Sequence, residues 1–196
     1  MKPSEDNIKL GKNIAAAIGL EPHVYPYFDQ DNKNMIYILD CKDPLDNNIK
    51  FYSTICVSDA FNEIEMKDNS FKDIRVEILM MGNNSTDKWG NILSTTGFYI
   101  TKNSWSAEPG TIFKNILNEY VPDVHLPHIL FTRPFPWGEK LSEPMILESK
   151  NVHFLLAIPV SDTEANFLDQ NGYSALEKLF LNSDADIHDI NRPSVV

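Results

Sequence analysis

This sequence of 196 residues has few cysteines and no long hydrophobic run. Its two cysteines, Cys41 and Cys56, are too few for a disulfide framework in a chain of this length, so we expect two free thiols. No stretch approaches the roughly 18 uninterrupted apolar residues of a membrane span, and the N-terminus lacks the apolar segment of a secretory signal. These features predict a cytoplasmic protein without a membrane anchor.

Motifs for catalysis and for cofactor binding are missing as well. The eight glycines form neither a phosphate-binding loop nor a dinucleotide fingerprint, and there is no nucleophile elbow. His125 and His128 are three residues apart, but Pro127 disfavours a helix that would present both to a metal. We therefore predict no catalytic residue, no cofactor and no metal site. A hydrolase that uses Asp40 or the histidines is a third alternative.

The charge of the chain is strongly negative. Lys and Arg number 17 against 28 Asp and Glu, which gives a formal net charge of -11. Such a field repels nucleic acid and anionic membranes and draws basic proteins towards the surface. The charge thus predicts a protein partner, with no binding to nucleic acid or membrane. The alternative is that the acidity only keeps the protein soluble.

The first half of the chain contains signals for helices and for strands. Apolar residues at helical spacing predict a helix over Ser4–Ile18, with Ser4 as its cap. A second helix follows residues 82–85 and is expected to be capped by Ser85 or Thr86. Three strands lie between the two helices, and an antiparallel meander is their most economical arrangement. Their expected ranges are 35–41, 49–57 and 74–81.

The second half begins with a short predicted helix over Ile112–Leu117 and a strand over His128–Thr132. Val152–Val160 is apolar almost throughout, which is typical of a central strand covered on both faces. Two helices separated by Gly172 follow. Each opens with a Ser-x-x-Glu capping box, at Ser161 with Glu164 and at Ser174 with Glu177. The whole pattern predicts a single domain over residues 1–196, of mixed α/β (α+β) class, with a central, largely antiparallel sheet flanked by helices.

Two segments are candidates for binding a partner. Trp137 lies in a loop that Pro134 and Pro136 stiffen, and a rigid loop loses little entropy on binding. A tryptophan in such a loop either covers the core or anchors an interface. Trp105 lies in another loop and poses the same choice.

The C-terminal tail is the second candidate. Its aspartates alternate with Ile187 and Ile190, and Arg192 follows. The isoleucines could pin an extended segment with solvated aspartates, or the aspartates could form an acidic ledge beside a hydrophobic groove. The predicted partner-binding residues are Trp137, Asp184, Asp186, Asp189 and Arg192.

A resemblance to a known family rests mainly on the last 46 residues. An apolar strand runs into a Pro-Val-Ser-x-x-Glu turn at residues 159–164, and a Gly-x-x-x-Leu-Glu helix start follows at 172–177. The chain closes with an Ile-x-Asp-x-x-Arg-x-Ser pattern at residues 187–194. These motifs resemble the C-terminal part of the Suppressor-of-fused-like domain, in particular its stand-alone bacterial members. The similarity extends over about residues 8–196, although Cys56 and Val57 stand where the family usually has a glycine.

The resemblance implies a mixed α/β domain that binds proteins and catalyses nothing. Eukaryotic members are two-domain regulators that clamp a peptide, and we expect no second domain in this protein. Bacterial members act largely as immunity proteins that neutralise polymorphic toxins, often nucleases, whose basic surfaces an acidic inhibitor attracts. The leading hypothesis is therefore a toxin-neutralising immunity protein with a basic toxin domain as its partner. A general peptide-binding adaptor is the alternative, and it would bind short linear peptides rather than a folded domain.

Overall fold

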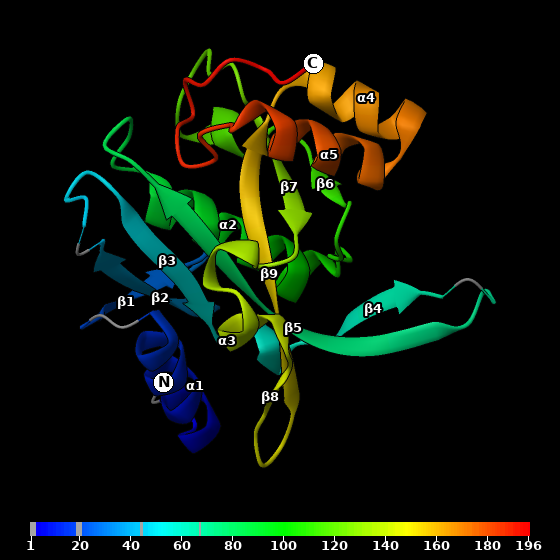
Figure 1. The fold of residues 1–196 in the computed structure, drawn as a ribbon. Coiled ribbons are helices and arrows are strands. Elements are labelled where there is room, and N and C mark those ends of the chain that lie inside the picture. The colour runs from blue at the N-terminus through cyan, green and yellow to red at the C-terminus, as the bar shows by residue number, and fades with distance from the viewer. Residues whose placement is uncertain (1–2, 19–20, 44, 67) are drawn as a thin grey trace.

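The structure is a computed structural model that describes residues 3–18, 21–43, 45–66 and 68–196. Within them, nine strands form one sheet in the order β1-β2-β3-β5-β9-β7-β6, and β4 and β8 pair with β5 and β9 (Figure 1). The strands are β1 (His23–Phe28), β2 (Met35–Lys42), β3 (Lys50–Ile55), β4 (Asn62–Glu65), β5 (Phe71–Gly82), β6 (Ile112–Phe113), β7 (His128–Thr132), β8 (Met145–Ile146) and β9 (Asn151–Val160). The α-helices are α1 (Glu5–Ile18), α2 (Trp89–Asn103), α3 (Glu139–Ser142), α4 (Asp162–Asn171) and α5 (Tyr173–Ser183).

The sheet is largely antiparallel, as the sequence predicted. β2 and β3 form the expected hairpin, and β3 pairs with β5 to complete the meander. β5 and β9 are parallel, which the long connection between them through α2 and β7 allows. The mixed α+β class with flanking helices is thereby confirmed.

β9 lies between β5 and β7 at the centre of the sheet. From Val152 to Val160 all its residues are buried except His153, which is partly exposed. An apolar run covered on both faces was the expectation for this strand, and the structure confirms it.

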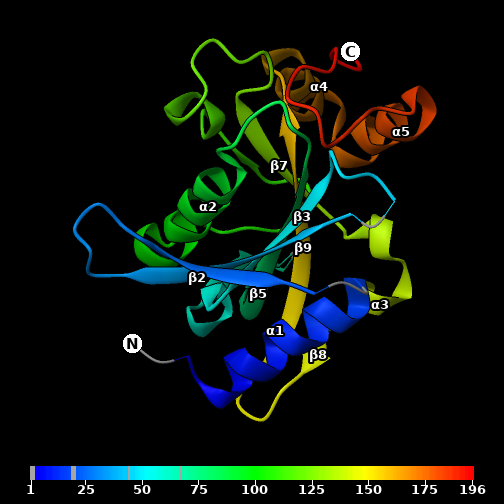
Figure 2. The ribbon, with the colours of Figure 1, turned by 90° about the vertical axis from the view of Figure 1, so that its left-hand side faces the viewer.

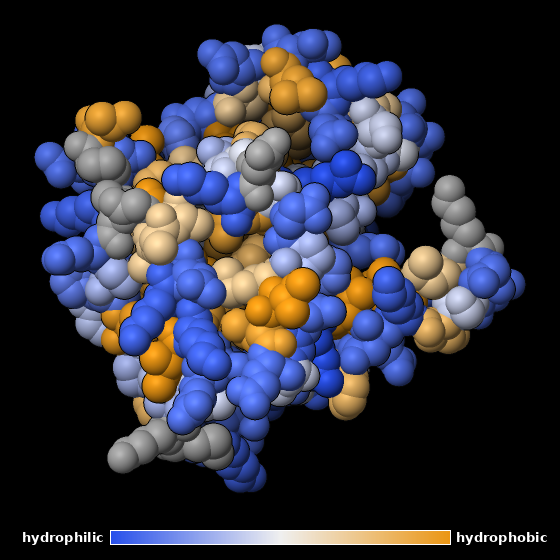
Figure 3. Space-filling view, turned by 60° about the horizontal axis from the view of Figure 1, so that its bottom comes forward, coloured by the Kyte–Doolittle hydropathy of each residue, from blue (hydrophilic) through white to orange (hydrophobic). Residues whose placement is uncertain are grey.

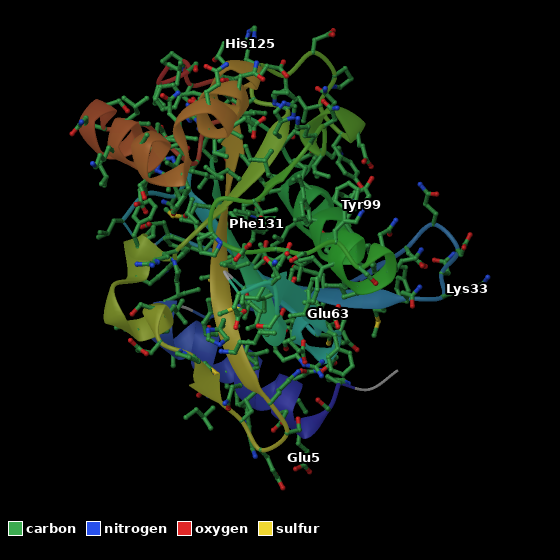
Figure 4. All side chains as sticks on the ribbon, turned by 90° about the vertical axis from the view of Figure 1, so that its right-hand side faces the viewer. Glu5, Lys33, Glu63, Tyr99, His125 and Phe131 are labelled. Atoms are coloured by element: carbon green, nitrogen blue, oxygen red, sulfur yellow. The ribbon has the colours of Figure 1, made fainter. Side chains whose placement is uncertain are left out.

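The two faces of the sheet carry separate cores, and Figure 2 shows α2 on one side with α1, α3 and α5 on the other. The α2 face packs Trp89, Ile92 and Leu93 against Ile78 and its neighbours. Phe131 of β7 belongs to this core, and α2 presents Tyr99 on the same side (Figure 4). The opposite core contains Leu10 and Ile14 of α1, Leu141 of α3 and Leu176 of α5.

A buried carboxylate organises the turn after β3. Glu77 is fully buried on β5, and it accepts hydrogen bonds from the Cys56 amide (3.0 Å), the Ser58 amide (3.1 Å) and the hydroxyls of Ser58 (2.7 Å) and Thr54 (2.5 Å). Cys56 turns its amide towards this carboxylate by adopting a left-handed conformation, with φ of 89°. Glycine adopts this conformation without strain, whereas the Cβ atom of Cys56 makes it costly.

Three local predictions are wrong. Ile112 and Phe113 pair with β7 as the edge strand β6 instead of starting a helix, because Asn115 has φ of 61°, which an α-helix cannot accommodate. Helix α2 begins at Trp89 after Lys88 and has no side-chain cap, since Thr86 accepts from the Lys88 amide in a separate turn. Helix α5 begins directly after Gly172, so Ser174 lies inside its first turn and is not a cap.

Two other capping predictions are confirmed, and one hairpin was missed. Ser4 accepts from the Asn7 amide at the start of α1, and Ser161 with Glu164 forms a complete capping box on α4. The sequence analysis did not predict β4, which pairs with the first residues of β5. The β4–β5 hairpin projects from the body of the molecule (Figures 1 and 3).

Candidate functional site

An apolar groove of about 430 Å³ opens beside helix α5. Leu130 of β7 and Ile158 of β9 contribute to its lining from the sheet. Phe180 and Leu181 line it from α5, and Phe135 lines it from the turn after β7. The groove thus brings together Phe135 of the Pro-rich loop and Asp184 of the tail, two segments that the sequence proposed separately.

Two carboxylates line this groove. Glu177 accepts a hydrogen bond from the Tyr173 hydroxyl at 3.0 Å, and Asp184 lies just after α5 with φ of 49°. Among the residues that the structure describes, no basic side chain forms an ion pair with either carboxylate. The groove therefore combines apolar walls with negative charges that remain free to meet a cation.

Tyr173 also lines the groove and has an unusual hydroxyl. Its pKa is raised well above the ordinary value, first by burial and then by the hydrogen bond and the negative charge of Glu177. The positive charge of Arg133 opposes this rise. The hydroxyl therefore stays protonated and continues to donate to Glu177 throughout the physiological pH range.

The tail beyond the groove is fixed to the body by Arg192. Its guanidinium donates to both carboxylate oxygens of Glu164, at 2.7 and 3.0 Å, and to the carbonyls of Pro159 and Pro193. Ile190 is buried as well. The tail is thus held against α4 and the end of β9, so its acidic side chains project from a fixed backbone.

The predicted site residues occupy different environments. Asp184 lines the groove, whereas Asp186 and Asp189 lie further along the tail. The Asp186 carboxylate lies against the His188 imidazole, and Asp189 accepts from the Asn191 amide at 2.9 Å. Arg192 is buried and paired with Glu164, so it positions the tail. Its contact with a partner stays a prediction.

Trp137 is half-buried and packs edge-on against Phe51, with 5.7 Å between the ring centroids. This contact makes it a cover over the α1 face of the core. Its neighbour Phe135 is 56% exposed and lines the groove instead. The sequence analysis missed Phe135, although its position between Pro134 and Pro136 offered the same signal of a stiffened loop.

The second loop tryptophan packs on neighbouring rings, although 40% of its surface is exposed. Trp105 stacks on Tyr99 of α2 at 4.3 Å and packs edge-on against Phe113 at 4.9 Å. These contacts hold the loop after α2 against the core.

The residues that the structure describes contain no cluster of His, Cys, Asp or Glu able to hold a metal ion. His128 is buried, and its Nδ1 accepts from the Asn115 amide at 2.9 Å while its Nε2 lies 3.0 Å from Asp162. It is thus a strand residue whose two ring nitrogens both have partners. Across the same described ranges, no helix is long and apolar enough to cross a membrane.

Three comparisons relate the chain to known proteins. The profile of the family described as Suppressor of fused protein (SUFU) matches residues 32–193. The immunity protein YqcF of Bacillus subtilis (strain 168) is 33% identical over 196 residues, which is the full length of both chains.

Solved structures show the same fold. A suppressor of fused homolog from Neisseria gonorrhoeae superposes with a TM-score of 0.77 at 16% identity, over 98% of this chain and 97% of the other. A chain in the Sufu–Fu complex gives a TM-score of 0.68 at 12% identity, over 99% of this chain and 93% of the other.

Proposed function

Because this chain belongs to the Suppressor of fused family, we propose that it is a bacterial immunity protein, which binds a toxin and blocks it without catalysing a reaction. The observation that carries the proposal is the full-length, 33% identical match to a protein named as an immunity protein. Identity at this level over whole chains supports a shared role as well as a shared fold.

The proposed partner is a basic toxin domain, with nucleases as the favoured class. The net charge of -11 supports this choice, because nuclease active sites bind phosphates through basic surfaces. An acidic inhibitor is attracted to such a surface over long range, and the attraction speeds association. The proposed place of action is the cytoplasm, which the two free cysteines support.

A peptide-binding adaptor is the second candidate, and the free sheet edge favours it. β1 ends the sheet, and most of its side chains are exposed, including Val24, Tyr25 and Phe28. An exposed edge strand offers backbone groups to which a peptide can add as a further strand. Pro26 has no amide hydrogen and weakens this edge as a template, which ranks the adaptor second.

The test is capture from the native host with the tagged full chain, followed by expression of the captured protein. We expect one stoichiometric basic protein that stops growth when expressed alone, and normal growth when this chain is co-expressed. Capture of non-toxic regulators by way of short linear segments would replace the immunity role with the adaptor. Untagged host lysate on the same resin is the control for background binding.

A further inference from the structure

We propose that the groove beside α5 is the docking surface for the partner, and that it takes a cationic segment carrying one apolar or aromatic side chain. This inference deepens the proposed function and rests on it, since it takes that segment to belong to the toxin. The groove is made by Phe135, Leu181 and the start of the tail, with Glu177 and Asp184 on its lining.

Charge complementarity identifies the occupant. Residues 161–196 contain seven Asp and Glu against two Lys and Arg, and one of those two, Arg192, is already paired with the buried Glu164. Lys178 is then the remaining cation of this segment. Asp184 and Glu177 lie beside exposed apolar side chains, where a cation is partly shielded from water and attracted more strongly than in the open.

The apolar walls explain why the occupant carries an apolar or aromatic side chain. Phe135 is 56% exposed and Leu181 is 73% exposed, so both have apolar surface that nothing in the described chain covers. Aromatic and arginine side chains that fill such pockets supply most of the binding energy of protein interfaces. Because Pro134 precedes Phe135 and Pro136 follows it, the backbone of this wall is restricted before the partner arrives.

Two other apolar surfaces fit a basic partner less well. A pocket of about 410 Å³ between α1 and the start of the sheet is lined by Lys12, and none of its described lining residues is acidic. Phe61, just before β4, and Phe71 of β5 are exposed. The guanidinium of Arg75 already lies over the Phe61 ring, 3.9 Å from its centroid. The α1 pocket thus lacks the carboxylates that a cationic segment needs.

The test uses the amidated pentapeptide KRFKR, titrated into the isotope-labelled full chain and followed by NMR. We expect the amide signals of Phe135, Leu181 and Ala185 to shift. KRSKR, without the aromatic ring, should bind at least about threefold more weakly, and the acidic peptide EDFED should leave the groove unchanged. Equal binding of KRFKR and EDFED, shifts confined to the α1 pocket or the β4–β5 hairpin, or no binding would overturn the proposal.

Charge variants on the full chain provide the second readout. Asp184→Asn keeps a residue that tolerates the left-handed conformation, and Glu177→Gln keeps an acceptor for Tyr173. Each should weaken KRFKR binding by about threefold, the effect typical of one partly exposed charge pair. Arg133→Gln should strengthen it, because the positive charge of Arg133 acts on Tyr173 in the groove lining. Asp68→Asn, at an exposed aspartate between β4 and β5, is the control and should change nothing.

These results separate failure of the groove from failure of the proposed function. If the peptide binds the groove but no toxin is captured, the groove stands and the partner is a basic peptide of another kind. If a toxin is captured and neutralised equally well by the variants Asp184→Asn and Glu177→Gln, the immunity role stands and the groove proposal is wrong.

Discussion

Arg192 and Glu164 form an ion pair inside the protein, 28 residues apart in the sequence, with side chains only 2% and 0% exposed. Glu164 also accepts from the amides of Ser161 and Val195, so one carboxylate caps α4 and fastens the tail. A buried carboxylate needs such partners, because water no longer solvates it. The pair therefore couples the helix start to the end of the chain.

Removing the arginine should destabilise the whole domain. Arg192→Met leaves Glu164 buried without its cation, and we expect a loss of about 3–5 kcal/mol in the free energy of unfolding. The double variant Arg192→Met with Glu164→Gln removes both charges and should recover a large part of that loss. Urea denaturation of the two variants checks this, and equal stability of the single and double variants would contradict a buried-charge penalty.

Cys56 offers a test of backbone strain. The variant Cys56→Gly relieves the left-handed conformation, whereas Cys56→Ala keeps the Cβ atom and removes the thiol in the same way. We expect the glycine variant to be about 1 kcal/mol more stable than the alanine variant. Thermal unfolding of both provides the comparison, and an alanine variant as stable as the glycine variant would mean that the turn holds no strain.

Glu77 should give the stability a particular pH dependence. Burial raises the pKa of its carboxyl, although hydrogen bonds from Thr54 and Ser58 oppose the shift. A carboxyl group with a higher pKa in the folded chain binds more protons there than in the unfolded chain. Its contribution to stability therefore falls as the pH rises above about 4.3, the pKa of a glutamate in the unfolded chain.

The variant Glu77→Gln isolates this contribution, because an amide of the same shape does not titrate. We expect the stability of the wild-type protein relative to this variant to decrease between pH 4 and the raised pKa of Glu77. Denaturation of both proteins across this range measures it. A constant difference would show that the carboxyl keeps one protonation state throughout.

Phe135 and Trp137 should separate binding from stability. Phe135→Ser removes an exposed ring, so we expect the free energy of unfolding to change by less than about 0.5 kcal/mol. Binding of the captured toxin should weaken about tenfold or more. Trp137→Ala removes the ring that packs on Phe51 and should cost about 1–3 kcal/mol of stability. Phe71→Ser, at a ring that is 68% exposed on the β4–β5 hairpin, is the matched control for Phe135.

Ionic strength tests the role of the negative charge. If the charge of -11 steers the partner, the association rate with the captured toxin should fall at least severalfold between 0.05 and 0.5 M salt. Dissociation should change less, because it depends on short-range contacts more than on long-range attraction. Stopped-flow mixing gives both rates. An association rate that does not depend on the salt concentration would mean that the acidity serves only solubility.

The sequence alone determined the features that depend on near neighbours in the chain. The apolar run of β9, the β2–β3 hairpin, helix α1 and the Ser161–Glu164 capping box follow from periodicity and from contacts three or four residues apart. The C-terminal motifs also belong to the sequence, and they led to the family.

Only the tertiary structure decided which of these residues are exposed and which are buried or paired. Trp137 and Phe135 lie in one stiffened loop. Trp137 packs against Phe51 from a distant part of the chain, whereas Phe135 stays exposed. Asp184 and Arg192 share one tail, yet Glu164 draws the arginine inside while the aspartate stays on the groove. Burial and pairing depend on residues brought together from distant positions, and the local pattern of a single segment does not contain that information.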